Sequence, residues 1–252
     1  MTARLFGCFV ALSIMVRLVN ADEVKVAVAS NFAAPMKAIV AAFEQTTDHR
    51  VKLSFGSSGK FYAQIKNGAP FSVFFSADQA KPVALEAQGM TVAGSRFTYA
   101  TGQLALWSAK TGYIEEGRDI LAGGEYTRIA LANSRLAPYG AAAVEVLDHL
   151  ELKDNTQAKW VRGENIAQTY QFVRTGNADL GFVAFSQIVE SGQKDKGGYW
   201  LIPSELHSPI LQDVVLIKSG SNNRAAHALM NFVRDQTARG IIESYGYKIP
   251  PN

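Results

Sequence analysis

Three short segments of the chain combine hydroxyl, amide and glycine residues in patterns that could bind an anion. They are 29–31 (Ala-Ser-Asn), 56–59 (Gly-Ser-Ser-Gly) and 137–140 (Ala-Pro-Tyr-Gly). Hydroxyl and amide side chains donate hydrogen bonds, and glycine lets a ligand approach the backbone N–H groups closely. The same small polar residues are common helix N-caps, so capping by the serines and the asparagine is the alternative interpretation.

The glycine-rich segment does not complete either of the catalytic patterns that it partly matches. A nucleophile elbow needs glycine two residues after Ser58, where the sequence has Lys60. A phosphate-binding P-loop needs glycine at the position of Ser54 and serine or threonine at that of Phe61. A secreted hydrolase that uses Ser58 stays an alternative, and it would need a general base within hydrogen-bond reach.

Residues that could coordinate a metal cation are scattered along the chain. The four histidines, at positions 49, 149, 207 and 227, stand at no metal-ligand spacing, and Cys8 is the only cysteine. We find no pair of carboxylates suited to acid–base catalysis. The sequence therefore predicts no protein-coordinated metal, no cofactor and no catalytic residues, and we do not expect an enzyme.

The balance of charge argues against a polyanionic partner. The chain has 25 basic and 22 acidic residues, and two of the basic ones, Arg4 and Arg17, lie near the amino terminus. A nucleic-acid-binding protein usually carries a strong basic excess, which this balance does not provide. We therefore expect no nucleic-acid partner.

The first 21 residues have the pattern of a secretory signal peptide. Arg4 supplies the positive start, 5–16 is the apolar core, and 19–21 (Val-Asn-Ala) resembles a cleavage site. The apolar core is shorter than the roughly 20 residues that span a bilayer. The sequence thus predicts cleavage after Ala21 and a mature protein that is soluble in the periplasm.

Strand and helix patterns alternate along the chain, which predicts the α/β class. The β-branched run 24–29 predicts a strand, and apolar residues in 36–43 recur at helical spacing. Strands at 51–55 and 73–75 are followed in the same way, the latter by a helix over 79–88. Alternation of this kind favours mainly parallel sheets flanked by helices.

The alternation restarts after Gly102, which predicts two lobes. Further strands are expected at 97–99, 104–107, 128–132, 160–162, 180–184 and 213–217, followed by a terminal helix. We assign 22–102 and 210–252 to lobe I and 103–209 to lobe II, joined near Gly102 and Pro209. Ligands of open α/β sheets bind beyond the carboxyl ends of strands, where the three polar segments are expected to lie.

These motifs, taken in order, resemble the periplasmic molybdate-binding proteins of bacterial ABC importers, and the resemblance runs through the whole chain after the signal peptide. The residues that carry it include 29–32 (Ala-Ser-Asn-Phe), 54–59 (Ser-Phe-Gly-Ser-Ser-Gly), 74–78 (Phe-Phe-Ser-Ala-Asp), 137–140 (Ala-Pro-Tyr-Gly) and 178–184 (Ala-Asp-Leu-Gly-Phe-Val-Ala). The resemblance implies a type II periplasmic binding protein, in which two lobes close on a tetrahedral oxyanion.

The resemblance also implies which residues hold the ligand. Matching the motifs position by position indicates Ser30, Asn31, Ser58, Tyr139 and the backbone N–H of Ile166, with Ser57 as a candidate extra donor. The ligand would be molybdate or tungstate, so that molybdenum is bound as an oxyanion and not as a coordinated cation. The implied partner is the membrane permease of an ABC importer, and we expect the protein to be a monomer.

One position departs from the pattern of the family. Many members have a tyrosine where this chain has Ala184, and the hydroxyl of that tyrosine contacts the anion. We expect Asn31 and Tyr139 to compensate for the missing donor. Sulfate, phosphate and ferric ion are alternative ligands, although iron capture typically needs clustered tyrosines or carboxylates.

Overall fold

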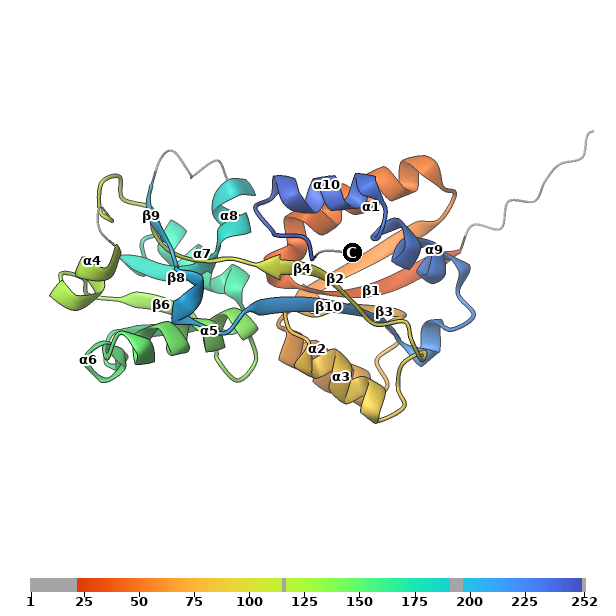
Figure 1. Ribbon diagram of the computed structural model, residues 1–252, viewed down its shortest axis with the longest axis horizontal. Helices are drawn as coiled ribbons and strands as arrows, with labels where there is room; N and C mark the ends of the chain where they lie inside the picture. Colours follow the sequence, from red (N-terminus) through yellow and green to blue (C-terminus); the bar gives the residue numbers. More distant parts are fainter. Residues whose placement is uncertain (1–21, 115–116, 191–196, 251–252) are drawn as a thin grey trace, which may run out of the picture.

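Two five-stranded sheets, each flanked by helices, lie end to end in the computed structural model (Figure 1). The structure describes residues 22–114, 117–190 and 197–250, so the predicted signal peptide and its cleavage site lie outside the described residues. In the part described, no helix is long and apolar enough to cross a bilayer.

The first sheet contains strands from both ends of the chain. Its order is β2 (Arg50–Gly56), β1 (Glu23–Ala29), β3 (Val73–Phe75), β10 (Ile210–Leu216) and β4 (Phe97–Gly102). Strand β1 pairs in parallel with β2 and β3, whereas β10 is antiparallel to β3 and β4. Four strands therefore run in one direction and β10 alone is reversed.

The second sheet repeats this arrangement with strands from the middle of the chain. Its order is β7 (Trp160–Gly163), β6 (Ile129–Ala132), β8 (Leu180–Ala184), β5 (Leu104–Ser108) and β9 (Gly198–Leu201). Strand β6 pairs in parallel with β7 and β8, and β5 is antiparallel to β8 and β9. The prediction of mainly parallel α/β sheets is confirmed, with one reversed strand in each sheet.

Helices cover both faces of the first sheet because each has one apolar side. In α1 (Ala33–Thr46), the residues Met36, Ile39, Val40 and Phe43 are buried at helical spacing. This helix shares a core cluster with α9 (Arg224–Phe232) and α10 (Gln236–Ser244), which lie on the same face (Figure 1). The opposite face is covered by α2 (Ser58–Lys66) and α3 (Ala80–Ala87).

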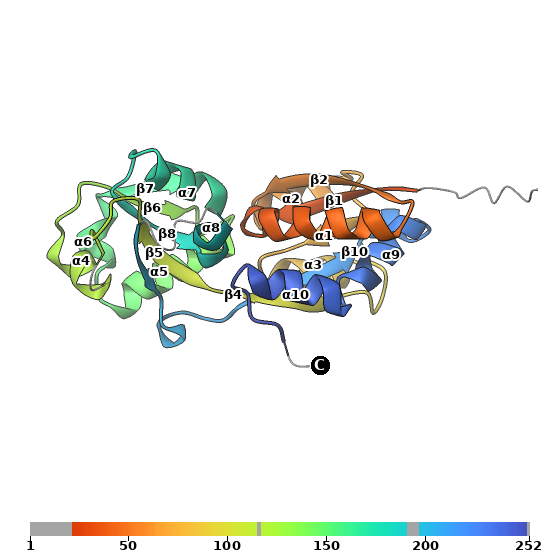
Figure 2. The ribbon, with the colours of Figure 1, turned by 90° about the horizontal axis from the view of Figure 1, so that it is seen from above.

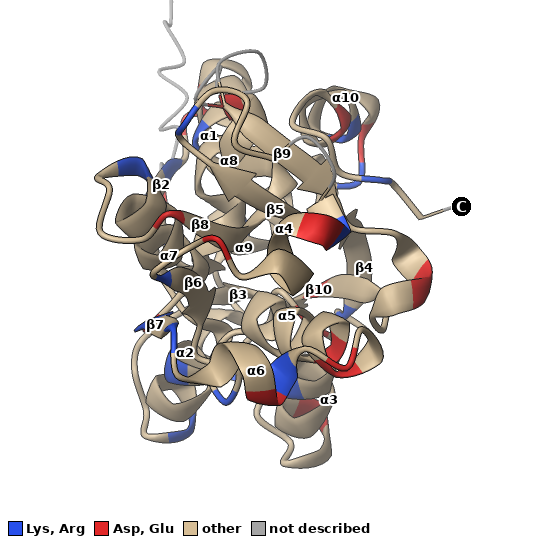
Figure 3. Cartoon of the chain, turned by 90° about the vertical axis from the view of Figure 1, so that its left-hand side faces the viewer, with Lys and Arg blue, Asp and Glu red and all other residues tan. Residues whose placement is uncertain are grey.

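The second sheet is covered in the same way. One face packs against α5 (Pro138–His149), whose Ala143, Val146 and Leu147 are buried, and near it lies α6 (Lys153–Gln157). The other face packs against α7 (Ile166–Arg174) and α8 (Phe185–Glu190). A short helix, α4 (Gly117–Gly123), lies at the outer end, where acidic and basic residues both occur (Figure 3). We call each sheet with its helices the first half and the second half.

The chain passes between the halves twice, and the two passages are neighbours. The first leads from β4 into β5, and the second leads from β9 through the 3-10 helix η3 (Ser204–Leu206) into β10. Because Ile210 pairs with Gly102, both passages meet at one end of the first sheet, as Figure 2 also shows from above. Narrow double connections of this kind allow two halves to rotate against each other.

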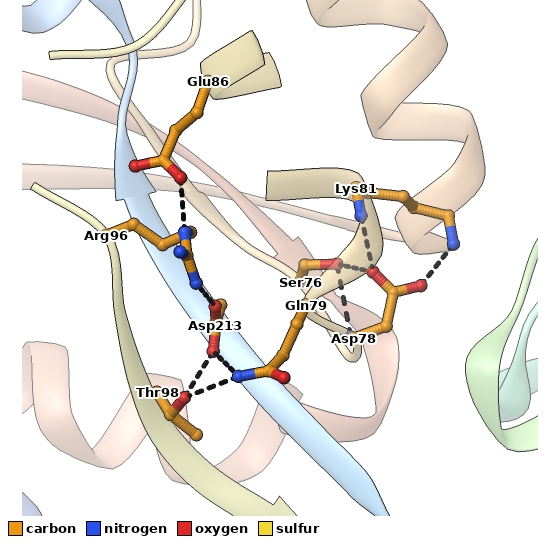
Figure 4. A network of polar contacts seen from close by, with 8 residues as sticks. All are labelled: Ser76, Asp78, Gln79, Lys81, Glu86, Arg96, Thr98 and Asp213. Carbon is orange, nitrogen blue, oxygen red and sulfur yellow. Dashed lines mark hydrogen bonds and ion pairs between the residues drawn. The ribbon is translucent and has the colours of Figure 1, made fainter. Parts of the chain in front are cut away.

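A buried carboxylate holds β10 in the first sheet (Figure 4). Asp213 is fully buried and accepts hydrogen bonds from Arg96 Nη1 (2.6 Å), the Thr98 hydroxyl (2.6 Å) and Gln79 Nε2 (3.2 Å). Arg96 also pairs with Glu86 (2.5 Å), and hydrogen bonds to Glu86 and Asp213 raise the pKa of the Arg96 guanidinium. Strand β10 is thus linked to β4 and to α3.

Replacing this carboxylate should lower the stability of the folded protein. We expect Asp213→Ala to lower the free energy of unfolding by about 3 kcal/mol, because breaking a buried pair leaves polar partners without compensation. Glu86→Ala removes a partly exposed partner of the same Arg96 and should cost about 1 kcal/mol or less. Urea unfolding of both variants measures the difference, and equal losses would contradict the role of Asp213 as the anchor.

Candidate functional site

All six residues proposed from the sequence line one small cavity between the halves. The cavity is lined by Ala29, Ser30, Asn31, Gly56, Ser57, Ser58, Ala77, Ala137, Pro138, Tyr139, Asn165 and Ile166. The six proposed residues come from four separate loops, as expected for segments that follow strands. The space suits a small inorganic ion and is too small for a nucleotide or peptide.

Each of these loops connects the carboxyl end of a strand to the start of a helix. Strand β1 leads into the 3-10 helix η1 (Ser30–Phe32), while β2, β6 and β7 lead into α2, α5 and α7. The first N–H groups of an α-helix have no acceptor within the helix, so helix N-termini carry partial positive charge. Three such N-termini, beginning at Ser58, Pro138 and Ile166, border the cavity, which favours an anion.

The lining of the cavity is uncharged. Among the described residues that line it there is no Lys, Arg, His, Asp or Glu. The charge of a bound anion would thus be offset by hydroxyl and amide dipoles alone. The same observation argues against a serine hydrolase, since no general base lies beside Ser58 in this lining.

Ser58 is placed to donate a hydrogen bond into the cavity, and its neighbour caps the helix. Ser57 is the N-cap of α2, and its hydroxyl accepts from the Lys60 N–H (3.4 Å). The Ser58 hydroxyl instead accepts from the Ala77 N–H (2.9 Å), which leaves its own hydrogen to be donated. The alternative interpretation of Ser58 as an N-cap is therefore wrong.

The side chain of Asn31 is engaged behind the cavity. Its Nδ2 donates to Gln212 Oε1 (2.8 Å) and to the Tyr247 hydroxyl (3.0 Å), which uses both amide hydrogens. The backbone carbonyl of Asn31 accepts from the Tyr247 hydroxyl (2.7 Å) and the Ser186 hydroxyl (3.0 Å). In this structure both hydrogens of the side-chain amide are therefore engaged with the protein, and the expectation that Asn31 compensates for the missing donor stays a prediction.

The hydroxyl of Tyr139 lies in the same buried cluster. It accepts a hydrogen bond from Gln212 Nε2 (3.2 Å), and the side chain is almost completely buried. Tyr139 is the second residue of α5, so its backbone N–H is one of the first-turn amides beside the cavity. Gln212 also accepts from the Tyr99 hydroxyl (2.9 Å) and was not singled out by the sequence, since one glutamine in an apolar strand carries no motif.

Position 184, where the sequence departs from the pattern that it resembles, is not part of the cavity lining. Ala184 is fully buried in β8, and its N–H donates to Gln187 Oε1 (3.0 Å). Gln187 in turn donates through Nε2 to the carbonyl of Ile166 (3.3 Å), at the start of α7. The sequence analysis missed Gln187, which connects β8 to one of the helix N-termini at the cavity.

Contacts between the halves lie next to the cavity. Lys60 of α2 pairs with Glu164 (2.9 Å), and the Gly59 N–H donates to the carbonyl of Leu136 (2.9 Å). A Cβ atom at position 59 would lie 3.0 Å from the Cα and O atoms of Leu136, so glycine permits this close approach. The Lys60–Glu164 pair is exposed and contributes less than about 1 kcal/mol.

Metal ligands do not gather elsewhere in the described part of the chain. Residues 22–114, 117–190 and 197–250 contain no group of three or more His, Cys, Asp or Glu that could hold a cation. The cavity between the halves is the candidate binding site.

Comparison with known proteins agrees with this geometry. Residues 24–248 match the family model described as bacterial extracellular solute-binding protein. The chain belongs to this family. Its members are binding proteins, in agreement with the expectation that this protein is not an enzyme.

Individual relatives cover almost the same length. The molybdate-binding protein ModA of Azotobacter vinelandii is 51% identical over 90% of each chain, and that of Rhodobacter capsulatus is 44% identical over 90% of this chain and 88% of its own. A solved structure of an Azotobacter vinelandii periplasmic molybdate-binding protein superimposes with a TM-score of 0.87 at 41% identity, over 90% of this chain and 100% of the other.

The buried tyrosines behind the cavity should make stability depend on alkaline pH. Burial raises the pKa of Tyr247 to about 12 and that of Tyr99 and Tyr139 well above the usual 10. A raised pKa in the folded state contributes stability below pH 10 that is lost as the pH rises towards 12. We expect unfolding free energy to fall by up to about 1.4 kcal/mol per pH unit for each tyrosine.

Chemical unfolding at pH 9, 10 and 11 tests this dependence. Tyr99→Phe removes one of the buried hydroxyls and should make the decline above pH 10 less steep than in the unmodified protein. If the two proteins lose stability in parallel, ionisation of Tyr99 does not contribute to the decline.

Proposed function

We propose that the protein binds molybdate or tungstate outside the cytoplasm and delivers it to the membrane permease of an ABC importer. The observation that supports this most directly is an uncharged cavity bordered by three helix N-termini. Relatives at 51% and 44% identity are molybdate-binding proteins, which supports the choice of oxyanion. On this proposal the first 21 residues direct export and are removed by cleavage after Ala21. The mature protein is a monomer.

The proposed ligand contacts combine side-chain and backbone donors. The hydroxyls of Ser30 and Ser58 would donate to the oxyanion, together with the backbone N–H groups of Asn31, Tyr139 and Ile166. Ser57 would add a backbone N–H. Every one of these groups is neutral, so the number of donors and their spacing determine which anion is held.

Capture would proceed by closure of the two halves around the anion. Donors from Ser30, Asn31 and Ser58 belong to the first half, while those from Tyr139 and Ile166 belong to the second. An anion that contacts both sets interacts more strongly with the closed form and shifts the population towards it. The closed protein would then dock on the permease.

The donor-only lining also indicates which anions should be excluded. A protonated oxyanion such as hydrogen phosphate carries an O–H that needs an acceptor, and no carboxylate lines the cavity in the part of the chain described. Sulfate carries the same charge as molybdate but is smaller. It would have to be distinguished by the spacing of the donors.

Oxyanions of different size and protonation should therefore stabilise the protein to different extents. A ligand at 100 times its dissociation constant adds about 2.7 kcal/mol to the stability of the folded state. For a chain of this size we expect the melting temperature to rise by roughly 5 to 10 °C with molybdate or tungstate. Calorimetric melting with equal concentrations of molybdate, tungstate, sulfate and phosphate decides the matter. An equal rise with sulfate would contradict the proposed ligand.

Removing the hydroxyl of Ser58 should weaken binding of molybdate. A charge-assisted hydrogen bond to the anion contributes about 1.5 to 3 kcal/mol, so Ser58→Ala should raise the dissociation constant roughly ten- to a hundredfold. Stability should also fall by about 1 to 3 kcal/mol, because the buried Ala77 N–H loses its acceptor.

A remote capping variant separates the two effects of this substitution. Asn223 caps α9 by accepting from the Ala226 N–H (2.8 Å) and is absent from the cavity lining. Asn223→Ala should cost about 1 kcal/mol of stability with molybdate affinity unchanged. Titration calorimetry and ligand-free melts compare the variants, and normal affinity in Ser58→Ala would remove its hydroxyl from the proposed site.

A further inference from the structure

A single buried glutamine connects two cavity residues that belong to different halves. Gln212 lies in β10, where the register with β4 shifts between Gln212 and Asp213, and its side chain is fully buried. One end of its amide, Oε1, accepts from Asn31 Nδ2 (2.8 Å), and the other end, Nε2, donates to the Tyr139 hydroxyl (3.2 Å). Asn31 follows β1 of the first half, and Tyr139 begins α5 of the second.

We propose that Gln212 is a positioning residue, which sets the distance between the Asn31 and Tyr139 loops and thereby the selectivity of the cavity for larger tetrahedral oxyanions. This inference rests on the proposed function. The side-chain amide is planar and rigid, so two hydrogen bonds at its opposite ends fix the relative position of the groups they contact. A change at either end alters the spacing of the backbone donors that face the ligand.

Spacing has unusual weight in this cavity because its lining carries no charge. A charged side chain attracts any anion of suitable size, whereas neutral donors act over hydrogen-bond distance and direction. Sulfate and molybdate share charge and shape and differ in size. The distance between donors from opposite halves is therefore the property by which this lining can separate them.

At the first connection between the halves, a glycine leaves space for the hydrogen bond between Gln212 and Tyr139. Gly102, the last residue of β4, lies against the Tyr139 hydroxyl and the Gln212 side chain. A Cβ atom at this position would overlap the Tyr139 hydroxyl and lie 2.6 Å from Gln212 Nε2. The bridge thus contacts both connections between the halves, β4 through Gly102 and β10 through Gln212 itself. The geometry of the bridge is therefore set at the two connections between the halves.

The variant Gln212→Met tests the proposal, because methionine is unbranched and of similar length but lacks a strong donor or acceptor. Losing the bridge should raise the molybdate dissociation constant about tenfold, the effect expected for roughly one hydrogen bond. The sulfate dissociation constant, measured by competition with molybdate, should change less than about threefold on the same scale. The sulfate dissociation constant divided by the molybdate dissociation constant is the readout, and it should fall, since a purely structural role would not alter this ratio.

Two further variants complete the experiment. Tyr99→Phe removes the other donor to Gln212 Oε1, comes from outside the cavity lining, and should keep the ratio of the unmodified protein. Tyr139→Phe removes the second-half end of the bridge and should lower the ratio as Gln212→Met does. The double variant should show no additional loss, because both substitutions break one bridge.

The outcomes separate this inference from the proposed function. An unchanged ratio in folded Gln212→Met would overturn the inference and leave molybdate binding intact. If that variant does not fold, Tyr139→Phe decides in its place, with an unchanged ratio again overturning the inference. Failure of the unmodified protein to bind molybdate would contradict the proposed function, and the selectivity bridge with it.

Discussion

The arrangement of the molecule follows from holding an anion with neutral groups only. Without a charged side chain, the cavity relies on backbone and hydroxyl dipoles, and helix N-termini are the strongest of these. Within one sheet, two helix N-termini lie at the same edge when the strands that precede them run in the same direction. The parallel strands β1 and β2 of the first sheet, and β6 and β7 of the second, satisfy this condition. Their carboxyl ends supply the loops that meet at the cavity.

The reversed strand of each sheet has a different task. Strands β5 and β10 follow the two passages between the halves and lead to no helix N-terminus at the cavity. Reversal of β10 brings Ile210 beside Gly102, so that both passages lie together. On the proposed function, two adjacent connections would limit the motion of the halves to rotation about that region, and closure would bring the same loops together each time. The buried side chains of Gln212 and Asp213 hold this region through hydrogen bonds on either side of β10.

The sequence predicts the alternating elements well and the partners of buried polar groups poorly. Strands at 73–75 and 180–184 have the predicted bounds, because each is a short apolar run beside turn residues. Strand β9 was missed, although its Tyr-Trp-Leu run (199–201) is as long as the apolar run of β3. Strand β10 begins at Ile210, whereas the predicted strand begins at 213. The polar Gln212 interrupts the apolar pattern, which hides the first part of the strand. The side-chain partners of Gln212 and Asp213 lie 73 or more residues away along the chain, a separation that local spacing does not reveal.

The same limit explains why the role of each side chain at the cavity is difficult to predict from the sequence. Convergence of the loops follows from strand order and is visible in the sequence, whereas the role of each side chain depends on a shift of one residue at a helix start. Ser57 caps α2 and Ser58 faces the cavity, although the two are chemically identical. Asn31 was expected to donate through its amide, but that amide bonds to Gln212 and Tyr247.

The position of Asn31 bears on how the proposed site could hold an anion without the tyrosine that the family resemblance leads us to expect at position 184. A tyrosine hydroxyl rotates and must be ordered when the ligand binds, which reduces the free energy gained. The Asn31 peptide is instead held by hydrogen bonds at its side chain and at its carbonyl. An N–H group fixed in this way is oriented before the ligand arrives, as are the first amides of α5 and α7. On the proposed function, a preorganised Asn31 N–H would offset the loss of a side-chain donor, and the buried cluster behind the cavity would supply that order.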